Sequence, residues 1–295
     1  MAIAYVTSTD NGVTGGSPAS VTFAHNNTTT GTNYCLLVAV CAYGSGSLGD
    51  RIQSVTYNGV AMTRAVFADT YSQEASGYVY IYYLMNPTSG SNNVVVTQTG
   101  SKATNLICSA ILYSGVDNVS PINAVGENGS NGGNLTTSAT LTAQSWLVGM
   151  GHIYNTITNA DGDTTTIRFP GSSTEYKWCD SNSALATGSR SLTLYADSSA
   201  FWIMGVVALK VLVQTSTITD GIKVGDTVSS FRVRISNLVE GIKVGDVAQT
   251  YKALVSLLAD GIKVGDLIST VINPITAWVN KVKSSTTWTK RGKRE

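Results

Sequence analysis

The chain has 295 residues, of which 43% are hydrophobic and only 13% are charged. This composition excludes an intrinsically disordered chain, because enough apolar surface is present to bury a core. The formal net charge of +1 excludes a general attraction to nucleic acid or to an acidic membrane. The length exceeds that of a typical single domain and fits one large domain with an appendage.

In chain order, residues 1–213 predict one short strand after another and no convincing helix. The segments are rich in β-branched and aromatic residues and are bounded by Gly, Asn, Ser or Pro. Asn58-Gly59 separates two alternating runs and predicts a type I′ hairpin turn. So many short strands predict a mainly β fold, an antiparallel β-sandwich or jelly roll. The predicted strands are 19–25, 33–43, 52–57, 60–68, 77–85, 93–99, 106–113, 135–142, 145–154, 174–180, 190–196 and 201–213.

Some of these segments, such as 33–43 and 201–213, are apolar at both even and odd positions. A strand of this kind has both of its faces buried. We therefore expect central strands with one face in the sandwich core. The other face must pack against something else, such as another subunit.

The four cysteines show no CxxC motif and no spacing typical of a metal site. We expect them to be reduced thiols in the core rather than a disulfide framework. The first residues lack the charged and long apolar regions of a signal peptide, so synthesis in the cytoplasm is expected. The longest apolar run, at 200–213, is too short to span a bilayer.

After residue 213 the pattern changes to a repeat of twenty residues, with GIKVGD at the start of each unit. The units are 220–239, 240–259 and 260–279. GIKVGD predicts a short extended piece, and the apolar 3-4-3 spacing that follows favours a helix. A period-2 strand is the competing interpretation of that second part, and Pro274 counts against a straight third helix.

A unit of this length cannot bury its own apolar side chains, so it must stack on the next unit or pair with another chain. We therefore divide the chain into a β-sandwich domain (1–213), an assembly or docking region of three repeats (214–280) and a tail (281–295). The tail holds six basic residues and one acidic residue. The residues expected to carry repeat assembly are Ile222, Val224, Phe231, Ile242, Val244, Tyr251, Ile262, Val264 and Trp278.

Motifs for catalysis are sparse, and we predict a protein that is not an enzyme and needs no cofactor or metal. His25 and His152 each lie in or beside a predicted strand, where a structural role is the usual one. The sequence GSGSLG at 44–49 matches a phosphate-binding pattern, but a strand follows it instead of a helix. The loop 159–163 alternates Asn and Asp as calcium loops do, but Pro170 occupies the position of the final acidic ligand. Adventitious calcium there stays an open alternative.

Tyr78, Tyr80 and Tyr82 share one face of a predicted strand. Such a tyrosine face could form a protein interface or stack on sugar rings. Cross-strand packing inside the sandwich is the alternative.

Three segments occur in a recognisable order: IQSVTYNGVAMTRA, YYLMNPTSGSNNVVVTQTG and YSGVDNVSPINA. Together they resemble a β-sandwich type found in virion proteins of tailed bacteriophages and in some large bacterial surface proteins. The resemblance covers roughly residues 33–213 and brings no catalytic residues with it. The C-terminal repeats likewise resemble the short repeats appended to phage appendage proteins.

The resemblance implies a bacteriophage virion structural protein, namely a capsid decoration, head-fibre or tail-fibre component. Its expected partners are further copies of itself and other virion proteins of the capsid or tail, and its expected location is the virion. The alternative is a carbohydrate-binding adhesin or receptor-binding module that uses the tyrosine face on a host-surface glycan. We expect no membrane or nucleic-acid partner. A glycan hydrolase lacks a carboxylate pair at a recognisable spacing.

Overall fold

The computed structural model describes residues 2–44, 49–69, 77–100, 102–161, 165–169 and 174–212 and five short strands beyond them. The chain divides into two compact units, Met1–Val213 and Gln214–Glu295. Every regular element of the described residues is a β-strand, which confirms the mainly β fold class. Within those residues, accordingly, no helix has the length and apolar character needed to cross a membrane.

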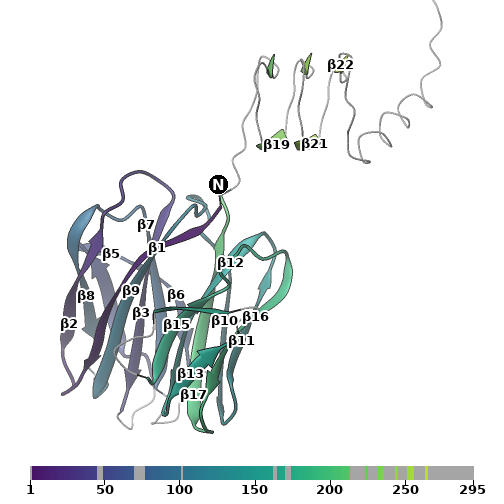
Figure 1. Ribbon diagram of the computed structural model, residues 1–295. Helices are drawn as coiled ribbons and strands as arrows, with labels where there is room; N and C mark the ends of the chain where they lie inside the picture. The colour runs from purple at the N-terminus through teal and green to yellow at the C-terminus, as the bar shows by residue number, and fades with distance from the viewer. Residues whose placement is uncertain are drawn as a thin grey trace, which may run out of the picture. The chain divides into compact units, whose positions relative to one another are not determined.

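The first half of unit 1 is a sandwich of two antiparallel sheets (Figure 1). Its five-stranded inner sheet has the order β1-β9-β3-β7-β6, and its four-stranded outer sheet has the order β2-β8-β4-β5. At the β4–β5 hairpin, Asn58 and Gly59 have φ of 49° and 76°, so the predicted turn with two positive φ angles is confirmed. The strands are β1 (Ala4–Thr14), β2 (Ser20–Asn27), β3 (Tyr34–Tyr43), β4 (Ile52–Tyr57), β5 (Val60–Ala61), β6 (Thr63–Ala68), β7 (Tyr78–Met85), β8 (Gly90–Gln98) and β9 (Asn105–Ser114).

The second half of unit 1 is another sandwich. Its inner sheet has the order β10-β17-β12-β15-β14, and its outer sheet has the order β11-β16-β13. The strands are β10 (Ile122–Asn131), β11 (Leu135–Leu141), β12 (Ser145–Ile153), β13 (Ile157–Ala160), β14 (Thr166–Phe169), β15 (Tyr176–Asp180), β16 (Gly188–Ala196) and β17 (Phe201–Lys210). The sequence predicted a single sandwich over these 213 residues, and the structure contains two.

The two sandwiches are copies of one folding unit. Replacing β1, β9, β3, β7 and β6 by β10, β17, β12, β15 and β14 converts one inner sheet order into the other. The order is that of a jelly roll, in which the strand formed by β5 and β6 pairs first with the outer sheet and then with the inner sheet. Register irregularities recur at equivalent places in both copies: Tyr5/Thr7 and Ile122/Ala124, Ile52/Ser54 and Ile157/Asn159, and Arg64/Val66 and Ile167/Phe169.

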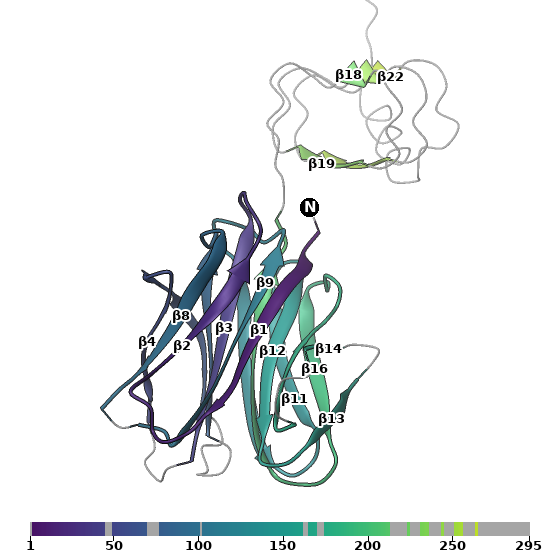
Figure 2. The same cartoon turned by 60° about the vertical axis from the view of Figure 1, so that its left-hand side comes forward.

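The four sheets of unit 1 lie side by side as layers, with the two inner sheets facing each other (Figures 1 and 2). Three hydrophobic cores fill the spaces between them. In β3, Cys35, Leu37, Ala39 and Cys41 enter the core between the sandwiches, and the intervening residues enter the first sandwich. The second buried face of such strands therefore packs on the other copy within the same chain, whereas the sequence suggested another subunit.

The space between the inner sheets is narrow where β17 crosses the first sandwich. A Cβ built on Gly205 would lie 2.8 Å from Val66 Cγ1 and 3.5 Å from Val79 Cγ1. The equivalent residue of the first copy is Ser109 in β9, whose Oγ accepts a hydrogen bond of 2.6 Å from Trp178 Nε1. Both contacts cross from one sandwich to the other, so the interface is close-packed at both places.

In unit 2 the described strands pair in parallel between successive repeats. β18 (Lys223–Val224), β20 (Lys243–Val244) and β22 (Lys263–Val264) align in register, as do β19 (Phe231–Ile235) and β21 (Tyr251–Val255). The predicted helix is therefore wrong at 231–235 and 251–255, where the competing strand interpretation holds. Of the residues predicted to carry repeat assembly, Val224, Val244, Val264, Phe231 and Tyr251 are in these strands. Ile222, Ile242, Ile262 and Trp278 and the tail 281–295 lie outside the described residues.

Replacing Gly205 by Val tests the packing of the two sandwiches. We expect the free energy of unfolding to fall by about 1–3 kcal/mol, because the added methyl groups overfill the interface. The matched control is Gly100→Val, since a Cβ at Gly100 meets no atom within 4 Å. Urea denaturation of both variants gives the comparison, and equal stability of the two would contradict the described interface.

Candidate functional site

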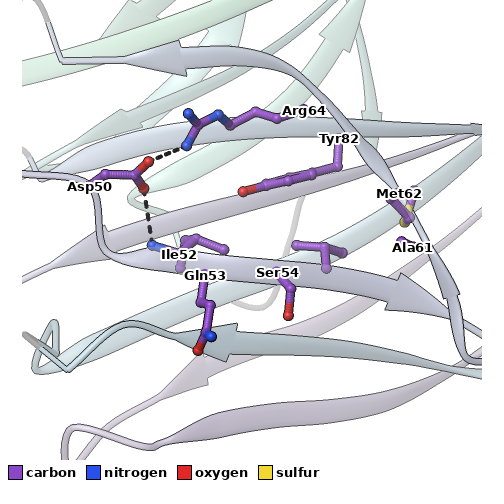
Figure 3. Close-up of a pocket in the computed structure, with 9 residues that line it drawn as sticks. Asp50, Ile52, Gln53, Ser54, Ala61, Met62, Arg64 and Tyr82 are labelled. Atoms are coloured by element: carbon purple, nitrogen blue, oxygen red, sulfur yellow. Dashed lines mark hydrogen bonds and ion pairs between the residues drawn. The ribbon is translucent and has the colours of Figure 1, made fainter.

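A pocket of about 460 Å³ lies at the edge of the first sandwich, where β4 and β5 of the outer sheet face β6 and β7 of the inner sheet. Its polar lining consists of Asp50, Gln53, Ser54, Arg64 and Tyr82. Apolar residues of β4 and β5 and the neighbouring Met62 complete the wall (Figure 3). The volume is within the range of small-molecule sites in proteins.

The main polar feature of the pocket is an ion pair between Arg64 and Asp50. The side chains of the two residues are 39% and 38% exposed, so solvent reaches both charges and the pair adds little stability. The other oxygen of Asp50 accepts a hydrogen bond of 3.2 Å from the backbone N–H of Ile52 (Figure 3). The hydrogen bond to Asp50 raises the pKa of the Arg64 guanidinium, which therefore stays charged.

The guanidinium of Arg64 also lies 5.3 Å from the centre of the Phe67 ring. Two aromatic residues of the inner sheet therefore lie beside the ion pair: Phe67 on β6 and Tyr82 on β7. Burial raises the pKa of Tyr82, and the charge of Arg64 opposes part of this effect. Tyr82 is accordingly a neutral phenol that can both donate and accept a hydrogen bond.

The tyrosine face predicted on β7 is buried. Tyr78, Tyr80 and Tyr82 are 6%, 0% and 5% exposed and belong to the core between the two sheets of the first sandwich. The hydroxyl groups of Tyr78 and Tyr80 accept hydrogen bonds of 2.8 Å from the backbone N–H groups of Gly49 and Arg51. An exposed interface or glycan face of three tyrosines is therefore wrong, and cross-strand packing is what the structure shows. Tyr82 alone of the three lines the pocket.

The two histidines lie in different sandwiches. His25 on β2 is fully buried; its Nδ1 lies 2.9 Å from Thr9 Oγ1, and its Nε2 has no hydrogen-bond partner in the part of the chain that is described. Burial lowers the pKa of His25 to about 4. His152 on β12 is also fully buried, with its ring centre 4.9 Å from that of Tyr43. The fold does not bring the two together.

The remaining motifs found in the sequence fall partly outside the described residues. This applies to 45–48 of the glycine-rich turn and to Asp163 of the Asn/Asp loop. Nowhere in the described ranges do three His, Cys, Asp or Glu side chains form a group that could hold a metal ion. The four cysteines are free and buried, as predicted, and burial raises the pKa of each thiol.

A second polar cluster, which sequence reasoning missed, lies between the two sandwiches. Asp180 on β15 is fully buried and accepts hydrogen bonds from the hydroxyl of Tyr113 at 2.7 Å and from Arg168 Nε at 2.5 Å. Burial tends to lower the pKa of Arg168, but the hydrogen bond and charge of Asp180 outweigh it, so the pKa is raised. The guanidinium also lies 5.3 Å from the Tyr5 ring centre and 5.8 Å from that of Trp146. The members come from separate parts of the chain, and no local motif could have joined them.

Replacing Arg168 by Met tests this cluster. We expect a loss of about 3 kcal/mol in the free energy of unfolding, because the buried carboxylate of Asp180 loses its cationic partner. The control is Lys210→Met, which removes the 3.5 Å pair with Asp117 at a more exposed position and should cost less than about 1 kcal/mol. The measurement is chemical denaturation at neutral pH. Similar losses in both variants would contradict the expectation that the buried pair contributes more to the free energy of unfolding than the exposed pair does.

Replacing His25 by Gln tests the pH dependence that its burial implies. The unfolded chain protonates His25 below its ordinary pKa of 6.5, whereas the folded protein does so only near pH 4. Stability is therefore lost as the pH falls from 6.5 towards 4, by about 2 kcal/mol at pH 4.5. The Gln variant should lose less stability than the wild type between pH 7 and pH 4.5. Parallel urea unfolding curves at both pH values measure the difference, and identical losses would refute the assignment to His25.

Comparison of the chain with protein-family models gives no match. Comparison with curated proteins likewise gives no match.

Proposed function

We propose that the protein is a structural component of a tailed-bacteriophage virion. It would be a capsid decoration, head-fibre or tail-fibre protein that assembles through its C-terminal repeats. The observation that carries the proposal is the duplicated jelly roll followed by repeats whose strands pair in register. Jelly rolls build viral capsid proteins and also lectins, and one fold can host many functions. The resemblance of residues 33–213 to phage virion proteins favours a virion protein over the other classes of jelly-roll protein.

The outer faces of the two sandwiches suit contacts with neighbouring proteins. On the second sandwich, Ser138 and Ser191 form a hydroxyl–hydroxyl hydrogen bond of 2.8 Å across the strands, and Thr136 and Thr193 form one of 3.0 Å. On the first sandwich, the exposed residues of β2 are Ser20, Thr22, Ala24 and Asn26. None of these residues is charged. Charged residues are depleted at the centre of protein interfaces, so these faces favour packing on other virion subunits.

The repeats supply the second element of the proposal. Parallel pairing of β18, β20 and β22 leaves a strand edge at each end of this sheet within the described residues. Such an edge can accept the same strand from another chain. This geometry supports the proposed homo-oligomer, joined strand to strand, or docking on another capsid or tail protein.

The experiment is to compare incorporation of two forms of the protein into phage particles. Virions purified on a density gradient should contain the full chain in many copies, measured by quantitative mass spectrometry. A phage that encodes only residues 1–213 should produce particles that lack the protein, because unit 1 folds around its own cores but loses the repeats. Full-length protein that is expressed but absent from particles would refute the virion proposal. Equal incorporation of both forms would refute assembly through the repeats.

A further inference from the structure

We propose that the pocket formed by Asp50, Arg64 and Tyr82 is a binding site for a neutral sugar. The site is a concave edge of the first sandwich and shares only Tyr82 with the tyrosine face considered from the sequence, since Tyr78 and Tyr80 do not line the pocket. The inference does not depend on the virion proposal, because the pocket and its chemistry belong to the first sandwich alone.

The duplication shows that the polar groups of the pocket are not required by the fold. The pairing of Arg64 with Tyr82 in the first copy corresponds to the pairing of Ile167 with Cys179 in the second. Both pairs directly precede the same register irregularity, so the positions are equivalent. The second copy therefore builds this edge from apolar residues, and Cys179 is fully buried there. Charge and a phenol at these positions add chemistry that the jelly roll does not need.

The position equivalent to Asp50 is also different in the second copy. Counting back from the equivalent residues Ile52 and Ile157, Asp50 corresponds to Asn155. Asn155 is neutral, and its Nδ2 donates a hydrogen bond to Ser198 within its own sandwich. The charged pair Asp50–Arg64 is thus present in one copy only. An exposed ion pair of this kind contributes little to stability. Its position in the pocket therefore favours a role in ligand recognition.

The chemistry of the pair fits adjacent hydroxyl groups. The carboxylate of Asp50 only accepts hydrogen bonds, the guanidinium of Arg64 only donates them, and the hydroxyl of Tyr82 can do both. A hydroxyl group is both donor and acceptor, so two neighbouring hydroxyls of a sugar can donate to Asp50 and accept from Arg64. Tyr82 lies beside Arg64 and can take part in the same network (Figure 3). Hydrogen bonds to charged groups are stronger than those between neutral groups.

The walls of the pocket select against other ligand classes. Ala61 is the exposed apolar residue of the wall, whereas Ile52, Val55 and Met62 behind it are buried in the core of the first sandwich. A purely apolar ligand would remove water from the ion pair without replacing its hydrogen bonds. An anion such as phosphate would meet an arginine whose charge is already balanced by Asp50. A volume of about 460 Å³ accommodates a neutral mono- or disaccharide.

The experiment uses the full chain and saturation-transfer NMR with glucose, galactose, mannose and N-acetylglucosamine as separate probes. At least one should bind, with a dissociation constant on the order of 1 mM. Tyr82→Phe and Arg64→Met should each weaken binding by about tenfold, the effect of losing one hydrogen bond. Lys210→Met should leave binding unchanged, because its ion pair with Asp117 is not part of the pocket. Thermal melting of each variant shows whether it is folded, and Tyr82→Phe keeps the shape of the ring.

Three results would overturn the inference. The first is that none of the neutral sugars binds to the wild type at about 50 mM, far above the dissociation constant expected for a functional site. The second is that a sugar binds but folded Tyr82→Phe and Arg64→Met bind it as well as the wild type does. The third is that glycine or sialic acid, added as two charged probes in the same NMR experiment, binds and no neutral sugar does, which would assign the pocket to a charged ligand.

Discussion

The structure depends on the mutual burial of the two inner sheets. Side chains alternate between the two faces of a strand, so a strand between two cores must be apolar at every position. β3, β9 and β17 meet this condition at every buried position except Ser109, whose hydroxyl is hydrogen-bonded to Trp178, and all but their terminal residues are buried. Each fully buried aliphatic side chain contributes about 1.5–3 kcal/mol, and neither inner sheet could leave this face in water. The outer sheets bury one face only, which is why β2 alternates exposed and buried residues.

A purely apolar interface between two similar sheets would not select one alignment of the sandwiches. The polar contacts make the two ends of this interface different. Tyr113, Asp180 and Arg168 form a hydrogen-bonded cluster. Ser109 accepts a hydrogen bond from Trp178, whereas Gly205, its equivalent in the second copy, lies against Val66. A displaced alignment would leave the carboxylate of Asp180 without its partners, at a cost of several kcal/mol. The cluster thus favours one arrangement of the two copies, while the apolar core supplies most of the stability.

The two copies share strand order and bulges but differ in the side chains at their edges. Residues that the fold requires should be of similar character in both copies, as the apolar inward positions Ile81 and Trp178 are. The pocket of the first sandwich departs from this rule, because Arg64 and Tyr82 correspond to Ile167 and Cys179. The comparison of the two copies therefore supports the proposed role of the pocket in ligand binding more directly than the shape of the pocket does.

The sequence by itself determined the β class, the Asn58-Gly59 turn, the buried reduced cysteines and the strands with two buried faces, because each depends on local periodicity or turn chemistry. It missed the strands 4–14, 122–131, 157–160 and 166–169, which are mostly polar or short and whose backbone is held by neighbouring strands. Only the tertiary structure decided that one predicted sandwich is two, since the copies agree in strand order and not in residues. It also decided that the tyrosines of β7 are buried and that Asp50 meets Arg64. The reason is physical: periodicity shows that a face is apolar or aromatic, but which surface covers that face depends on strands distant in the chain.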